Sequence, residues 1–295
     1  MPFTLAHAAA ALPLRILLRK AAVFPALVIG CFIPDVPYFL PAPLCDINAH
    51  QWPAIALFGI PCGWAMYIAW FGLLLEPIAA LLPRQWAALL VAARPRTLFA
   101  GHAGSGTLSL LAGAISHVAW DAFTHRRGLV VHAWPALARP ALHVGDQALP
   151  PYFVLQHGST VLGLLWLALH VRRRLREMPA AALVADATPP LRLQHKIAIA
   201  TMLPAATAGL VVWTFASAHA PRLSAYSVVC CCISTGAALG VAYALAWHAC
   251  RWRGTGSIDP PNFQDHELQN HSLRDRSRKG IDRPIRHRAP QHRSR

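Results

Sequence analysis

Residues 116–125 read Ser-His-Val-Ala-Trp-Asp-Ala-Phe-Thr-His and directly follow an apolar run at residues 108–115. His117, Asp121 and His125 are spaced four residues apart, so on a helix they lie one turn apart on the same face. Imidazole and carboxylate groups on one helix face are typical of zinc-type metal sites. Three polar residues at this spacing also serve as hydrogen-bonding partners between packed helices. The stretch alone leaves both interpretations open.

The composition is that of a membrane protein. Of the 295 residues, 55% are apolar and only 13% are charged, about half the charged share of a soluble domain. Several apolar runs reach or approach the roughly 20 residues that span a bilayer. The sequence therefore predicts an all-α fold, a polytopic integral membrane helical bundle of about five to six membrane helices.

The charge pattern also fits a membrane protein. A net charge of +15 would suggest nucleic-acid binding in a soluble chain, but here the Arg residues lie between the apolar runs and in the C-terminal tail. Loops that follow the positive-inside rule have this distribution. We therefore expect membrane lipids as partners and no specific nucleic acid, and the sequence indicates no protein partner. The seven Cys residues include no CxxC pair, which argues against a disulfide framework or a Cys-based zinc site.

The N-terminal region contains two short apolar pieces, residues 8–18 and 21–33, with Arg19 and Lys20 at their junction. They form either an antiparallel helical hairpin or one conventional span from about residue 21 to residue 40. We favour the hairpin because each piece is shorter than a span and the basic residues lie at the junction. Only the hairpin directly places His7 and Asp35 at the same end. The Pro34-Asp35-Val36-Pro37 turn cannot continue a regular helix.

The chain divides by composition into four parts. Residues 1–176 form a membrane domain that carries the His and Asp motifs, and residues 177–196 form a small-residue linker. Residues 197–250 contain two further transmembrane helices. Residues 251–295 are basic and poor in large apolar residues, which predicts a disordered tail.

The Arg clusters predict the topology. If the spans alternate, the clusters at 84–96, at 172–176 and beyond 251 lie on one side, which the positive-inside rule makes cytoplasmic. Arg126, Arg127 and Arg139 fall on the other side and weaken this bias. Ionisable residues are costly in a membrane, so their convergence at its outer edge favours a functional site. The residues that converge there are Asp35, His50, His117, Asp121, His125 and His157.

Four motifs together resemble the domain of unknown function 4184 family, a family of bacterial membrane proteins. They are the opening Met-Pro-Phe-Thr-Leu-Ala-His-Ala-Ala-Ala, the run from Leu27 through the Pro34 turn to Tyr38, the stretch at 116–125, and Gln-His-Gly-Ser at 156–159. The resemblance covers residues 1–174 well, extends loosely to residue 247 and excludes the tail. It implies a multi-pass protein of the bacterial inner (cytoplasmic) membrane, and the positive-inside rule places the basic tail in the cytoplasm.

The chain is more distantly similar to inner-membrane proteins that are predicted to be metal-dependent hydrolases. Matched residue by residue, this similarity implies five candidate metal ligands: His7, Asp35, His50, His117 and Asp121. His50 departs from the pattern of these relatives, because Gln51-Trp52 follows it where a small hydroxyl residue is expected. His157 is a sixth candidate ligand, from its predicted place at the same membrane edge.

The first functional hypothesis is a membrane-embedded metal-dependent hydrolase. Its cofactor would be a divalent ion, with Zn favoured and Mn or Fe as alternatives. Asp121 and His125 are the catalytic candidates, and Asp35 or Asp121 could also serve as general base. A site at the outer membrane edge suggests a lipid-like substrate with a phosphate or ester bond.

Two other functions remain open. In the first, the protein is not catalytic, and its His/Asp cluster is a structural metal site or a polar network that fixes helix packing. In the second, the protein transports protons or metal ions, since chains of His and Asp mark such paths. The transporter is less favoured because the ionisable residues cluster at one end and do not cross the bilayer.

Overall fold

The computed structural model describes residues 4–40, 47–95, 103–145, 147–179, 193–216 and 225–254. These residues are mostly helical, as expected. Within them the strands are confined to one short antiparallel hairpin, β1 (Leu142–Val144) with β2 (Gln147–Leu149). Most of the predicted linker at 177–196, and the predicted tail from residue 255 onward, lie outside the described residues. The chain forms two compact units, Met1–Trp247 and His248–Arg295, and the first contains the elements that build the site.

The N-terminal hairpin is present. The chain reverses at Arg19, whose φ of 49° is in the left-handed region, and the prolines of the returning segment convert it from α-helix to 3-10 helix. The Thr4 hydroxyl donates a hydrogen bond to Asp35 Oδ2 at 2.7 Å, so both ends of the hairpin meet. The prediction of a hairpin is therefore confirmed, and the alternative of one span at 21–40 is wrong. The segments are α1 (Thr4–His7), η1 (Ala8–Ala10), α2 (Ala11–Leu18), η2 (Arg19–Ala21), α3 (Phe24–Gly30) and η3 (Ile33–Phe39).

A continuous 30-residue helix, Trp52–Leu81, follows the hairpin. It contains two π-helical turns, η5 and η6, and a proline lies shortly after each turn, at Pro61 and Pro77. Because proline has no backbone N–H, the helix loses a regular hydrogen bond there and widens locally. The segments are α4 (Trp52–Ala54), η5 (Ile55–Gly59), α5 (Ile60–Ala69), η6 (Trp70–Leu74) and α6 (Leu75–Leu81), followed by α7 (Arg84–Ala92).

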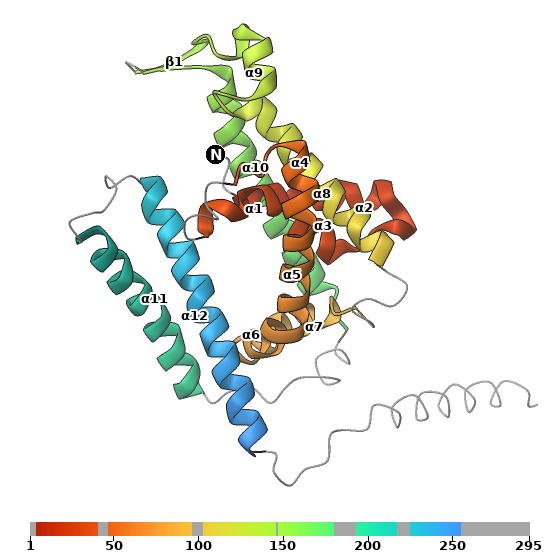
Figure 1. Ribbon diagram of the computed structural model, residues 1–295, viewed down its shortest axis with the longest axis vertical. Coiled ribbons are helices and arrows are strands. Elements are labelled where there is room, and N and C mark those ends of the chain that lie inside the picture. The colour runs from red at the N-terminus through yellow and green to blue at the C-terminus, as the bar shows by residue number, and fades with distance from the viewer. Residues whose placement is uncertain are drawn as a thin grey trace, which may run out of the picture. The chain divides into compact units, whose positions relative to one another are not determined.

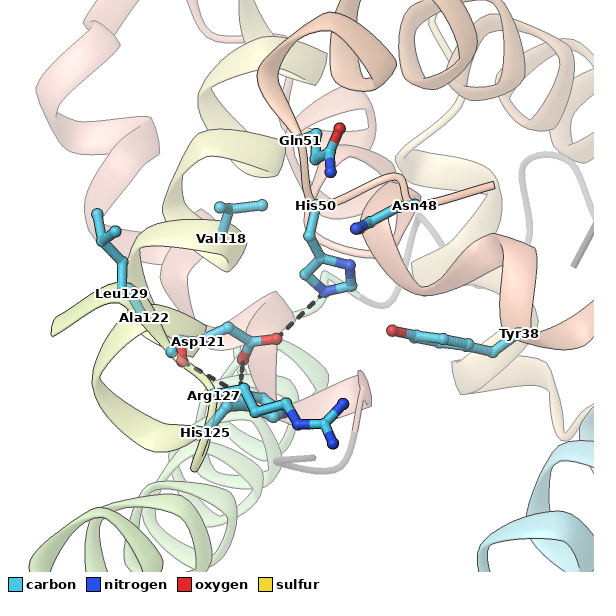
Figure 2. A pocket seen from close by; sticks show the side chains of 11 residues that line it. Tyr38, Asn48, His50, Gln51, Val118, Asp121, Ala122, His125, Arg127 and Leu129 are labelled. Atoms are coloured by element: carbon cyan, nitrogen blue, oxygen red, sulfur yellow. Dashed lines mark hydrogen bonds and ion pairs between the residues drawn. The ribbon is translucent and has the colours of Figure 1, made fainter. Parts of the chain in front are cut away.

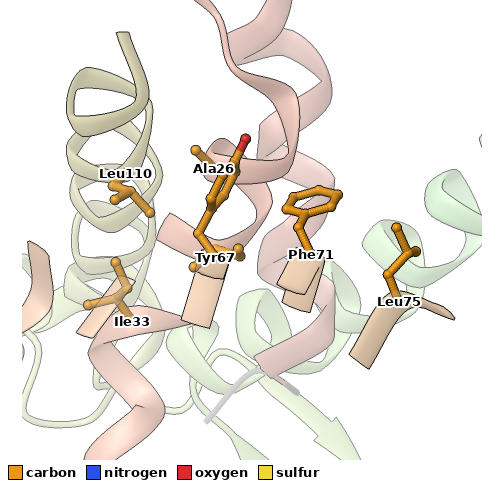
Figure 3. Packing of buried hydrophobic residues seen from close by; sticks show 7 residues of the cluster. Ala26, Ile33, Tyr67, Phe71, Leu75 and Leu110 are labelled. Carbon is orange, nitrogen blue, oxygen red and sulfur yellow. The ribbon is translucent and has the colours of Figure 1, made fainter. Parts of the chain in front are cut away.

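Helix α8 (Ala103–Thr124) carries the central motif and packs against α3 and α5 (Figure 1). The α3–α8 contact is close because glycines face each other: a Cβ added at Gly113 would lie 2.5 Å from the carbonyl oxygen of Leu27. Small residues allow helix backbones to approach in this way. A buried apolar cluster, which joins the hairpin, the Trp52–Leu81 helix and α8, holds this arrangement (Figure 3); its members are Ala26, Ile29, Ile33, Tyr67, Phe71, Leu75 and Leu110.

The remaining elements complete the helical protein. They are α9 (Leu129–Ala133), η7 (Pro135–Leu137), α10 (Pro151–Arg176), α11 (Leu193–Ala216) and α12 (Ala225–Gly254). Within the described residues, three helices are long and apolar enough to cross a membrane: Trp52–Leu81, Pro151–Arg176 and Val228–Trp252. Val161, Leu162 and Leu165 are exposed on α10, as suits a helix that faces lipid. The count of five to six spans stays a prediction.

Candidate metal centre

Four of the predicted ligands come together in space. Donor atoms of Asp35, His50, His117 and Asp121 all lie within 4.8 Å of one another, and all but His50 are buried. His117 Nε2 is 3.5 Å from Asp35 Oδ1 and 3.3 Å from Asp121 Oδ2. His50 Nε2 is 3.3 Å from Asp121 Oδ2 and 3.8 Å from Asp35 Oδ1. Tetrahedral coordination at about 2.1 Å separates neighbouring ligand atoms by about 3.4 Å, so these spacings fit one ion.

Three segments distant in sequence supply these four side chains. Asp35 lies in the proline-rich η3, and His50 lies just before the Trp52–Leu81 helix. His117 and Asp121 lie one turn apart on α8, as their spacing predicts. Figure 2 shows the His50 ring directed at the Asp121 carboxylate. The group includes His50 although the residues that follow it depart from the pattern of the relatives.

Outer hydrogen bonds orient two of the ligands. His117 Nδ1–H donates to the carbonyl oxygen of Cys31 at 2.7 Å. Because a carbonyl only accepts, the proton lies on Nδ1, and in the neutral ring Nε2 presents a lone pair to the two carboxylates. The Thr4 hydroxyl donates a hydrogen bond to Asp35 Oδ2, while Asp35 Oδ1 faces His117. Metal sites in proteins use such outer partners to set the tautomer and direction of their ligands.

The four-residue group, together with His7 and His125, forms a cluster of ionisable side chains. Several buried atoms of this cluster lack hydrogen-bond partners. Among the described residues, five buried side-chain atoms have none, and all five belong to this cluster: His7 Nε2, Asp35 Oδ1, His117 Nε2, Asp121 Oδ1 and His125 Nε2. Leaving a buried donor or acceptor unsatisfied costs about 1–3 kcal/mol. Lone pairs that face carboxylate oxygens repel them unless a proton or a metal cation lies between. The donor set therefore fits a divalent metal ion.

His7 and His125 approach the other oxygen of Asp121. His7 stacks on His117 with ring centroids 3.8 Å apart, and its Nε2 is 3.4 Å from Asp121 Oδ1. His125 Nδ1 is 3.3 Å from the same oxygen and donates to the Asp121 backbone carbonyl at 3.2 Å. Asp121 thus has imidazoles against both carboxylate oxygens.

The surroundings of two hairpin residues set their charge. Burial, together with the neighbouring His117, lowers the pKa of His7 to about 4, so His7 is neutral at pH 7 and free to bind a cation. Burial alone raises the pKa of Asp35, but His117 and the Thr4 hydroxyl outweigh it and bring the pKa below its ordinary value. Neutral imidazole and ionised carboxylate are the forms that bind metal.

His157, a predicted ligand, is not brought into this group. It is exposed on α10, its Nδ1 donates to the carbonyl oxygen of Phe153 at 3.0 Å, and its ring packs on that of Phe153. The neighbouring Gln156 is the residue of this turn that is buried. The orientation of α10 directs His157 away from the cluster.

Thr4 and the Cys31 carbonyl were not predicted as parts of the site. Thr4 is the first residue of α1. Its position one turn before His7 was the available signal, because it places the hydroxyl at the same helix end. The role of the Cys31 carbonyl has no sequence signal, since every residue has a carbonyl and only the packing of α3 on α8 selects this one.

Replacing Thr4 with valine, which has nearly the same shape, should lower metal affinity by about 10–100-fold, as loss of an outer hydrogen bond does in other metal sites. The reason is that Asp35 loses the donor that orients it. Competition with a chelator of known affinity measures the change. Thr201→Val is the control, because that hydroxyl bonds to Ile197 of its own helix. Equal affinity in the two variants would contradict the assigned role of Thr4.

Two cavities adjoin the cluster on different sides. One, of about 340 Å³, is lined by Tyr38, Asn48, His50, Asp121, His125 and Arg127, among others. Figure 2 shows Arg127 extending across this cavity toward the side where Tyr38 lies. The other, of about 500 Å³, is mainly apolar and is lined by His7, Ala9, Ser116, Trp120, Phe123 and Trp166, among others. The ionisable side chains thus contribute to both cavities. We call the first the polar cavity, after the ionisable residues that line it, and the second the apolar cavity.

Comparison with known proteins supports the family predicted from the motifs. Neither the curated proteins nor the solved structures contain a match to this chain. A family model does match, over residues 1–248, a range that includes the N-terminal hairpin, α8 and every residue of the cluster described above. By that match, the chain belongs to the family described as the domain of unknown function DUF4184.

Proposed function

We propose that this protein is a membrane-embedded metal-dependent hydrolase, with one ion held by Asp35, His50, His117 and Asp121. The observation that carries the proposal is the set of four donor atoms within 4.8 Å of one another, two of which, Asp35 Oδ1 and His117 Nε2, are buried without hydrogen-bond partners. Imidazole and carboxylate are the usual ligand types of a catalytic divalent ion, with Zn favoured and Mn or Fe as alternatives. With four protein ligands, a coordinated water would take a fifth position.

The chemistry follows from the donor set. When bound, a divalent ion would lower the pKa of a coordinated water and polarise a phosphoryl or carbonyl oxygen. His125 donates through Nδ1 to a backbone carbonyl, which leaves Nε2 as an acceptor at a residue that lines the polar cavity. A positioned imidazole of this kind serves as general base. His125 is therefore assigned that role, and Asp121 holds the ion.

The two cavities support a lipid-like substrate with an anionic head group. Arg127 lines the polar cavity, and a guanidinium matches phosphate oxygens in geometry and charge. Trp120, Phe123 and Trp166 line the apolar cavity on the His7 side and suit a hydrocarbon chain. A lipid phosphoester, held at the outer edge of the bacterial inner membrane, would present its polar bond to the ion between the cavities.

A purely polar packing network is less well supported. In such a network the side chains satisfy one another, whereas five buried atoms of this cluster have no hydrogen-bond partner. A structural metal site would account for these atoms equally well. Only turnover separates a structural ion from a catalytic one.

The test uses the full chain purified in detergent. Elemental analysis should find bound metal, and the protein should hydrolyse members of a panel of lipid phosphoesters and carboxyl esters in a chelator-sensitive way. His117→Ala should lose the metal and reduce turnover by more than about 100-fold, because it removes a ligand rather than an outer partner. His157→Ala, an exposed histidine outside the group, should retain both. Bound metal with no turnover of any ester would instead support a structural site.

A further inference from the structure

We propose that Asp121 bridges two metal ions, and that the second ion is held by Asp121 Oδ1 and His7 Nε2. This inference rests on the metal site proposed above and deepens it from one ion to two. The centre would then consist of Asp35, His50, His117 and Asp121 Oδ2 around the first ion, with His7 and Asp121 Oδ1 at the second.

The two oxygens of Asp121 have separate sets of neighbours. Oδ2 is 3.3 Å from His50 Nε2 and 3.3 Å from His117 Nε2. Oδ1 is 3.4 Å from His7 Nε2 and 3.3 Å from His125 Nδ1. A carboxylate that serves one ion needs nitrogen ligands near only one of its oxygens. His125 Nδ1 carries a proton and donates to a backbone carbonyl, so His7 Nε2 is the nitrogen that can share an ion with Oδ1. Ligand nitrogens at coordination spacing on both oxygens are the arrangement of a bridging carboxylate.

One ion does not satisfy the buried atoms. An ion on the Oδ2 side pairs with Asp35 Oδ1 and His117 Nε2, but Asp121 Oδ1 and His7 Nε2 remain buried without hydrogen-bond partners. His7 is only 7% exposed, and bulk water does not solvate it. A cation between these two atoms satisfies both, in the same way as the first ion satisfies its ligands.

The stacking of His7 on His117 sets the spacing of the two positions. The rings are nearly parallel, with 15° between their planes and 3.8 Å between their centroids, and each ring approaches a different oxygen of Asp121. Two-metal hydrolases hold their ions about 3.5–4 Å apart. The stack therefore holds the two rings at about the separation that a bridged pair of ions needs.

The second position has few protein ligands, which predicts its role. Two protein donors leave most of its coordination sphere to water and substrate, so it should fill at higher metal concentration than the first. His7 also lines the apolar cavity, so the second ion would lie where the proposed hydrocarbon chain meets the reacting bond. Two divalent ions and two carboxylates retain net positive charge, which favours an anionic phosphoester over a neutral ester.

Manganese provides a test that does not depend on turnover. The metal-free full chain in detergent is titrated with Mn²⁺, and bound metal and the electron paramagnetic resonance spectrum are recorded at each step. The parent should bind two ions per chain in two steps and develop the spectrum of an exchange-coupled pair. His7→Gln and His7→Ala should bind one ion and show only isolated Mn²⁺. His157→Ala should behave like the parent.

The spectrum of the parent decides the matter even if the His7 variants fold poorly. A single bound ion in the parent would overturn the proposal, and a loss of its affinity in His7→Gln would make His7 a fifth ligand of one ion. Two uncoupled ions would overturn the bridging role of Asp121. A coupled pair of ions in a protein that cleaves no ester would support the two-metal centre and refute the hydrolase. Ester cleavage with a single bound ion would support the hydrolase and refute the two-metal centre.

Discussion

Replacing Asp121 with alanine is expected to abolish metal binding and to reduce hydrolysis to background. Four imidazoles lie within 3.4 Å of its carboxylate oxygens, from His7, His50, His117 and His125. Without the carboxylate, every proposed ion loses its shared anion, so the loss of affinity should exceed the roughly 100-fold that removal of an outer partner causes. Elemental analysis and Mn²⁺ titration of the purified variant measure it.

The matched control for Asp121 is a carboxylate outside the cluster. Glu76 pairs with Arg94 at 3.2 Å, and Glu76→Gln should keep the full metal content. Circular dichroism establishes that both variants remain helical. Near-stoichiometric metal in Asp121→Ala would show that the donor atoms around Asp35 bind without it, and the bridged centre and the assigned ligand set would both be wrong.

Replacing Gly113 with valine is expected to destabilise the protein by about 2–3 kcal/mol, the usual range for overpacking a tight contact, and to remove the metal as well. A Cβ at this position would lie 2.5 Å from the Leu27 carbonyl oxygen and 2.7 Å from the Cys31 amide nitrogen. Both are backbone atoms of the α3 segment and cannot move aside like a flexible side chain. The helices must separate, and that separation pulls the Cys31 carbonyl away from His117.

Thermal unfolding in detergent, together with metal content, measures the effect. Gly158→Ala on α10 is the control, because a Cβ there meets no atom within 4 Å and alanine favours helix by up to about 1 kcal/mol over glycine. It should therefore melt at or above the parent temperature with its metal retained. Equal melting temperatures for Gly113→Val and Gly158→Ala would mean that the α3–α8 contact does not position the site.

Local signals in the sequence predicted much of this arrangement. The short apolar pieces and the prolines around Asp35 predicted a hairpin that returns to His7, and the spacing of His117 and Asp121 predicted a shared helix face. Chain reversal and helix periodicity depend on neighbouring residues, so a single sequence contains them. These features and the family resemblance together predicted the group of side chains that meets at the site: Asp35, His50, His117 and Asp121.

Other features depend on packing and could not be read in advance. The positive-inside rule assigns a residue to a side of the membrane, but it does not give the rotation of a helix about its own axis. For this reason His157 was expected in the group but lies outside it. The acceptor for His117 is a backbone carbonyl, selected by the close approach of Gly113 to α3. The separate neighbours of the two Asp121 oxygens likewise appear only when hairpin and α8 are in contact.

The hydrogen bond from His117 to the Cys31 carbonyl joins residues 86 positions apart, and this separation imposes an order on biogenesis. When a ribosome has delivered only the hairpin and the Trp52–Leu81 helix into the membrane, Asp35 has Thr4 beside it but neither His117 nor Asp121. Its carboxylate lacks these partners until α8 has been made. Loading of the proposed ion would therefore belong to a late stage of maturation, because docking of α8 on α3 first brings its four ligands together.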